Sequence, residues 1–335
     1  MRSKRLQNRV TTGRITLPIV ILLSLVCWII TSTLMSGTEI SRTIPSSGLF
    51  VTLNMYRWLE RLISFLLYTS IGYSLILLNN MFSIIRMRAS VQTSIYFMLV
   101  AICPFIHYLY AGNLVSAILI ASLYFLFKSY QQIHASGILF YTFLCIGIGS
   151  LLFPQLTFFA PIFWIGAYQL QSLSFKSFLA SFIGWCLPYW FLFGHAYFYD
   201  NMELFYRPFR ELVTFYPIDW TTGFPLWEII MLCYLFILYA VSSMHCLMAS
   251  YDDKIRTRIN LNFLILLNFF FFIYILLQPA QSIQMLPLLL VGVSILTGHL
   301  FVLTSSRSSN IFFIFTMVGL AGLFGFNIWT LLSNS

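Results

Sequence analysis

The sequence predicts an all-α protein that crosses a lipid bilayer many times. Of its 335 residues, 60% are hydrophobic and only 8% are Asp, Glu, Lys or Arg, whereas soluble domains carry about 25% charged residues. A water-exposed surface with so little charge would consist of large apolar patches. The apolar residues also fall in runs close to the length of about 20 residues that a helix needs to span the hydrocarbon core. We therefore expect lipid to cover most of the protein surface.

Eleven apolar runs follow one another, and we expect each to form one helix of a transmembrane bundle that is a single domain over residues 1–335. No soluble domain, linker or clear internal repeat interrupts the series. Two pairs with small-xxx-small spacing, Ala180/Gly184 and Ala321/Gly325, permit close helix contact. The predicted spans are 15–36, 61–79, 92–108, 114–127, 136–153, 155–170, 177–194, 226–245, 260–277, 285–303 and 311–332.

The distribution of charge predicts a cytoplasmic N-terminus. With the basic segment 1–14 inside, the inner segments hold 13 of the 18 basic residues, as the positive-inside rule requires. Most acids lie on the other side, since only Asp252 and Asp253 fall in an inner loop. The 13 basic residues are Arg2, Lys4, Arg5, Arg9, Arg14, Arg86, Arg88, Lys128, Lys176, Lys254, Arg256, Arg258 and Arg307.

The same distribution argues against several classes of function. The net charge of +9 is split into short clusters between apolar runs, which is typical of membrane orientation signals, so we expect no nucleic-acid partner. The sequence contains no GxxxxGK[ST], HExxH or GxSxG motif. Almost no ionisable residue lies near the middle of a span, which disfavours coupling to protons or ions.

The histidines and cysteines are read as packing residues, so the sequence predicts no metal site and no cofactor. None of the six cysteines forms a CxxC pair, and all lie in or beside apolar runs, where Cys is a common small hydrophobe. His299 falls toward the cytoplasmic end of its span, and His107 and His245 also lie near span ends. A neutral, packed histidine is the simplest interpretation of each.

The connection 195–225 is the longest polar segment between spans and is predicted to be extracytoplasmic. Its alternation of apolar and charged residues fits one short amphipathic helix at the membrane surface, interrupted near Pro208. A solvated interfacial helix explains this pattern. A gate over a lipid-linked substrate also explains it, with Arg207 and Arg210 binding phosphate through their planar guanidinium groups. The acids that would then assist are Asp200, Glu203 and Asp219.

Glu39 lies just beyond the outer end of the first span. A carboxylate in this position could accept the proton of an acceptor hydroxyl as a general base. An ordinary loop glutamate is the other interpretation, because a single carboxylate carries little specificity.

The order of several stretches resembles a family of multi-span inner-membrane proteins from Bacteroidetes with no assigned function. The stretches are LILLNNMFSIIRMR (75–88), the segment from LYFLFKSYQQ to IFWIGAY (123–168), SFIGWCLPYWFLFG (181–194) and KIRTRINLNFLILLNFFFF (254–272), and the similarity covers roughly residues 60–330. The resemblance implies the cytoplasmic membrane of a Gram-negative envelope and supplies no catalytic residues.

The arrangement of spans is also loosely similar to that of membrane glycosyltransferases that use polyprenyl-phosphate sugars, although a clear Asp-Asp or Asp-Glu pair in an outer loop is missing. The leading hypothesis is a protein of envelope biogenesis that acts on or binds a lipid-linked glycan at the outer face. Glu39 would be the base, with the arginines of 195–225 binding phosphate. The alternatives are a transporter or flippase for a lipid or small solute and a non-catalytic subunit of a membrane complex.

Overall fold

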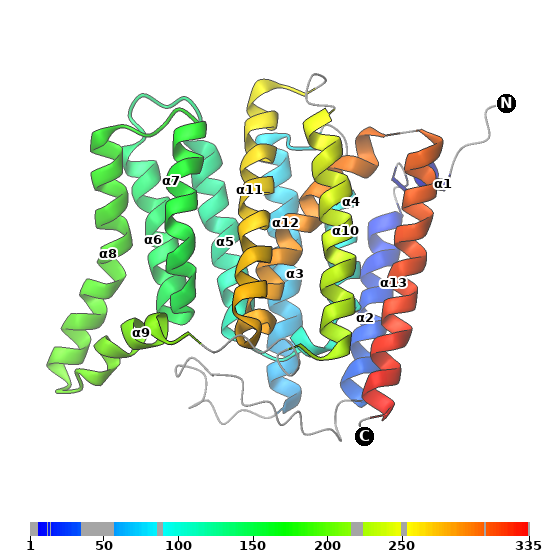
Figure 1. The fold of residues 1–335 in the computed structure, drawn as a ribbon, viewed down its shortest axis with the longest axis horizontal. Helices are drawn as coiled ribbons and strands as arrows, with labels where there is room; N and C mark the ends of the chain where they lie inside the picture. Colours follow the sequence, from blue (N-terminus) through cyan, green and yellow to red (C-terminus); the bar gives the residue numbers. More distant parts are fainter. Residues whose placement is uncertain are drawn as a thin grey trace.

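The computed structural model describes residues 6–11, 13, 15–34, 57–85, 90–215, 224–248, 253–304 and 306–333. Within these ranges the secondary structure is helical, and the helices form an elongated bundle (Figure 1). The helices are α1 (Leu6–Thr11), α2 (Thr16–Leu34), α3 (Arg57–Phe82), α4 (Ser90–Ala101), η1 (Pro104–His107), α5 (Ala111–Lys128), α6 (Ser136–Leu152), η2 (Pro154–Phe159), α7 (Ala160–Gln169), α8 (Phe175–Phe198), α9 (Glu203–Val213), α10 (Leu226–Met248), α11 (Ile255–Leu277), η4 (Pro279–Gln281), α12 (Ser282–Leu303) and α13 (Arg307–Ser333).

Eight helices among the described residues are long and apolar enough to cross a membrane, so the chain is a multi-pass membrane protein. They are α2, α3, α5, α8, α10, α11, α12 and α13. The other three predicted spans coincide with the shorter helices α4, α6 and α7, of 12, 17 and 10 residues. Pro104 and Pro154 follow the ends of α4 and α6, and each begins a short 3₁₀ helix, because a residue before proline is disfavoured in α conformation. A count of eleven crossings therefore stays a prediction.

The bundle has two chemically different ends. At the end of the bundle where α1 lies, two contacts join neighbouring segments: Arg256 Nη2 of α11 donates to Phe127 O of α5 at 3.1 Å, and Gln131 N donates to Leu170 O at 2.9 Å. We call this the predicted inner end. The predicted outer end holds α9 and the last residues of α13 (Figure 1). Because α1 and the end of α13 lie at opposite ends, the arrangement agrees with an odd number of crossings, while the sidedness rests on the charge distribution.

Helix α12 is the centre of the bundle. Its residues from Ser282 to Phe301 are all buried, and α4, α5, α10 and α11 pack around it. Two glycines let neighbouring helix backbones approach closely. A Cβ on Gly112 would lie 2.0 Å from Gln284 O, and a Cβ on Gly298 would lie 2.8 Å from Gln92 Cβ. Small residues let helix backbones approach in this way where water does not drive association.

Helix α8 lies at the edge of the bundle and packs mainly on α6 (Figure 1). A Cβ on Gly184 would lie 2.4 Å from Phe140 O, and one on Gly147 would lie 2.7 Å from Trp185 O. Gly184 of the first predicted pair thus lies in a helix contact. Gly325, from the other predicted pair, has nothing within 4 Å of an added Cβ, so that part of the second pair does not form a contact within the described chain.

Candidate functional site

The segment predicted as an extracytoplasmic loop contains a sharp reversal between α8 and α9. Asp200 has a positive φ of 51°, a conformation that Asp tolerates better than most residues. Its backbone N–H donates to Tyr197 O at 3.3 Å, and that of Asn201 donates to Ala196 O at 2.9 Å. These two bonds satisfy carbonyls at the end of α8 in a Schellman arrangement. Asp200 therefore lies in the turn that leads the chain from α8 back toward the bundle.

Helix α9 is continuous, so the prediction that it is interrupted near Pro208 is wrong. Pro208 lies inside the helix and is buried. It occupies the middle of an 11-residue helix, so the missing N–H removes only one bond of a short ladder. The consequence is that the charged residues on both sides of Pro208 lie on one helix.

The four charged side chains of α9 pair with one another. Arg207 Nε lies 2.8 Å from Glu211 Oε1. Arg210 contacts Glu203 through two atoms, with Nη1 2.6 Å from Oε1 and Nη2 3.3 Å from Oε2. The side chains of Arg210 and Glu203 are 66% and 61% exposed. The structure thus brings the predicted phosphate ligands together with Glu203 and Glu211, on the accessible face of the helix.

The opposite face of α9 packs onto α8. The rings of Phe205 and Phe193 lie 5.3 Å apart, and those of Phe209 and Tyr189 also lie 5.3 Å apart. Tyr189 is itself fixed, since its hydroxyl donates to Ser150 Oγ at 2.8 Å. These aromatic contacts hold α9 at the predicted outer end with its charged face outward.

An apolar groove of about 680 Å³ runs beside this contact. It lies on the exposed side of α8, where Trp190 is 71% exposed and Ile183 is 59% exposed. In a bilayer this side of α8 faces lipid, because the helix lies at the edge of the bundle (Figure 1). The lining residues are Phe182, Ile183, Cys186, Leu187, Tyr189, Trp190, Phe193 and Phe205.

Two predicted site residues, Glu39 and Asp219, lie outside the described residues.

The predicted outer end also holds a buried cation that the sequence analysis did not single out. Arg61 is 8% exposed. Its Nη1 donates to Ser32 O, its Nη2 donates to Tyr108 Oη at 3.2 Å, and its guanidinium lies 5.2 Å from the centre of the Tyr108 ring. These contacts join α2, α3 and the segment after η1. Arg61 could have been noticed from its place at the start of an apolar run, but its partners could not.

His107, nearby, is a packed side chain as expected. It is buried and stacks on Trp28, with ring centres 3.6 Å apart. Its Nδ1 lies 3.1 Å from Thr31 Oγ1, and its Nε2 lies 3.0 Å from Val100 O. Both ring nitrogens therefore have partners within the bundle.

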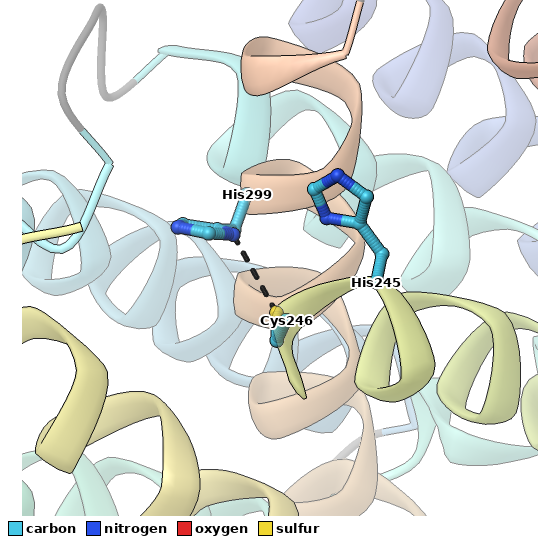
Figure 2. A group of neighbouring side chains, drawn as sticks. All are labelled: His245, Cys246 and His299. Carbon is cyan, nitrogen blue, oxygen red and sulfur yellow. Dashed lines mark hydrogen bonds between the residues drawn. The ribbon is translucent and has the colours of Figure 1, made fainter. Parts of the chain in front are cut away.

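The predicted inner end contains a cluster of metal-ligating side chains that the sequence did not indicate (Figure 2). His245 and Cys246 lie in the last turn of α10, and His299 faces them from α12. One ligand atom of each residue lies within 4.8 Å of the others. The cluster escaped notice because residues 246 and 299 are 53 positions apart, and no local spacing motif joins them.

No family model, curated protein or solved structure matches this chain.

Proposed function

We propose that this multi-pass membrane protein binds an amphiphilic, phosphate-bearing lipid at α8 and α9. The class that we favour is the polyprenyl-phosphate-linked glycan of a bacterial cell envelope, held at the outer face of the inner membrane. The observation that carries the proposal is the placement of an apolar groove of about 680 Å³ on α8 beside the charged face of α9.

The groove suits the hydrocarbon part of such a ligand. Its lining is apolar and rich in aromatic side chains, and because this surface faces lipid, van der Waals packing in the groove, not removal of apolar area from water, would favour a bound chain. Ordinary phospholipid also presents chains to this surface. Selectivity for one lipid therefore has to come from the headgroup side.

Helix α9 supplies that headgroup side. Arg207 and Arg210 carry planar donors that match phosphate oxygens. Each is paired with a glutamate, but exposed pairs of this kind contribute only about 0–1 kcal/mol. A phosphate group that accepts from the planar donors of both arginines can therefore displace Glu203 or Glu211 at low cost. Without a ligand, the ion pairs keep the two arginine side chains in an ordered geometry.

If the protein transfers a sugar from such a lipid, Glu39 is the proposed general base, and Asp219 or Asp200 would assist substrate binding. The observation favouring this extension is the bias of acids toward the predicted outer face. Its test is the substitution Glu39→Gln. Full transfer activity of that variant in membranes would remove Glu39 from this role.

The main experiment is native mass spectrometry of the protein extracted gently from its own membrane. We expect a co-purifying prenyl-phosphate lipid, lost when Ile183→Trp fills the groove. A matched control is Leu77→Trp, which fills a second apolar groove of about 460 Å³ between α3 and α5. The Leu77 variant should retain the lipid.

The charged face is tested in the same way with Arg207→Gln and Arg210→Gln together. We expect loss of the phosphate lipid with retention of bulk phospholipid. Bulk phospholipid alone in the unmodified protein, or equal loss in the Leu77 control, would contradict the proposal. A stoichiometric protein partner in place of lipid would instead favour a subunit of a larger complex.

A further inference from the structure

We propose that His245, Cys246 and His299 form a transition-metal site at the predicted inner end, with Asp253 orienting His299. Zn²⁺ is the ion that fits best. The site lies at the opposite end of the bundle from α9 and is independent of the lipid-binding proposal.

The set of donor atoms favours Zn²⁺. Two imidazoles and one thiolate form an N₂S combination that Zn²⁺ binds commonly and that Mg²⁺ and Ca²⁺, which prefer oxygen, do not. Three protein ligands leave the fourth position of a tetrahedral Zn²⁺ ion open. Sites of this composition also accept Co²⁺ and Ni²⁺, which makes a spectroscopic probe available.

The distances are the second argument. Cys246 Sγ lies 3.5 Å from His299 Nδ1 (Figure 2). Zn–S and Zn–N bonds of about 2.3 and 2.0–2.1 Å at a tetrahedral angle place sulfur and nitrogen about 3.5 Å apart. His245 lies on the same side, with its ligand atom within 4.8 Å of both. An ion can therefore bind after a small rotation of the His245 side chain.

Asp253 supplies the third argument. His299 Nε2 lies 3.0 Å from Asp253 Oδ2, with the two side chains 1% and 3% exposed. Nε2 is the ring atom facing away from Cys246, so Asp253 acts on His299 and does not take a ligand position. A metal-bound histidine usually gives its second ring nitrogen to a carboxylate, which fixes the tautomer and strengthens the ligand. Asp253 is thus a positioning residue.

Burial and charge agree with a bound dication. Cys246 is 4% exposed and His299 is fully buried, and buried charges need compensation. The charges of Zn²⁺, one thiolate and one Asp253 carboxylate add to zero. His245 Nδ1, also buried, has no hydrogen-bond partner, which leaves this nitrogen available as a ligand.

The position of the cluster indicates what the metal does to the fold. Two ligands lie in the last turn of α10, Asp253 lies two residues before α11, and His299 belongs to the central helix α12. A bound ion would join the ends of α10 and α12 and, through Asp253, link them to the start of α11. Access is from the predicted cytoplasmic side.

The test uses the purified full chain in detergent, reduced and stripped of metal, titrated with Co²⁺ and then Zn²⁺. We expect one equivalent of Co²⁺ to give the charge-transfer absorption of a Co²⁺–thiolate bond, bleached by Zn²⁺. Cys246→Ser should abolish that band and His299→Gln should abolish tight binding. The controls are Cys233→Ser, an exposed cysteine on the same helix, and His195→Gln, an exposed histidine of α8; both should bind normally.

Asp253→Asn separates positioning from ligation. The thiolate band should persist while the affinity for Zn²⁺ falls about 10- to 100-fold. X-ray absorption of the unmodified protein loaded with Zn²⁺ covers the case in which a variant does not fold. A shell with one sulfur at about 2.3 Å and nitrogens at about 2.0–2.1 Å is expected. A shell without sulfur, no binding by the folded protein, or unchanged binding by Cys246→Ser would overturn the proposal.

Discussion

The two ends of the bundle use the same kinds of charged side chain in opposite ways. At the predicted inner end, His299 and Asp253 contact each other at 1% and 3% exposure. At the predicted outer end, Arg210 and Glu203 contact each other at 66% and 61% exposure. The buried pair is fixed by the helices around it and cannot exchange partners with water. The exposed pair can exchange partners with water, so it could also exchange a glutamate for a lipid headgroup that binds reversibly.

The largest effect should follow from breaking the buried contact. Asp253→Ala leaves His299 Nε2 without its carboxylate inside the protein, and an unsatisfied buried polar group costs about 1–3 kcal/mol, more if it is charged. We expect a correspondingly lower free energy of unfolding, measured by chemical or thermal unfolding in detergent on metal-free protein. Glu203→Ala is the matched control. An equal, small effect of both variants would show that burial does not distinguish the two ends.

A second prediction asks whether helix contact matters as much as charge. Gly184→Leu places side-chain atoms where Phe140 O now lies, and overpacking typically costs about 1–3 kcal/mol. We expect the upper part of that range, because the neighbour is backbone and cannot rotate away. Gly325→Leu, where an added Cβ meets nothing, should be close to neutral, within about 0.5 kcal/mol. Comparable destabilisation of the two variants, in the same unfolding assay, would contradict the α6–α8 packing.

These glycines also show what the sequence could and could not predict. Eight of the predicted runs coincide with helices long enough to span a membrane, and the other three overlap shorter helices, because the length of a hydrophobic run is a local property. The small-residue spacing was the same at Gly184 and Gly325, yet only the first meets a neighbouring helix. Which face of a helix meets another helix depends on the whole bundle, and spacing alone does not contain it.

The candidate sites divide in the same way. The short amphipathic helix was predicted from the sequence, and the pair Arg207 and Glu211 has the i,i+4 spacing of a helical contact, whereas Arg210 and Glu203 are seven residues apart. The cluster of Cys246, His299 and Asp253 was not predicted. It assembles from two helices and a connection, and each member alone is indistinguishable from an ordinary packing residue.

A third prediction separates burial from position in the bundle. Arg61 lies at the predicted outer end, like α9, but is buried. If burial decides the cost, Arg61→Met should lower the free energy of unfolding by about 1.5–3 kcal/mol, because hydrogen bonds of a charged donor are lost. Arg210→Met is the exposed control and should change it by less than about 1 kcal/mol. A larger effect in the Arg210 variant would reverse this order.

The smallest effect on stability is expected for Glu203→Gln, and it tests the exchange of partners at α9 directly. Because the pair with Arg210 is exposed, its loss should change the free energy of unfolding by less than about 1 kcal/mol. The same substitution frees the guanidinium of Arg210 and should raise the affinity for vesicles containing a phosphomonoester lipid, while Arg210→Gln lowers it. Co-sedimentation with such vesicles, compared with neutral ones, measures the change. If Glu203→Gln leaves the affinity unchanged, the glutamate does not compete with the headgroup, and the paired arginines of α9 are then only a solvated helix face.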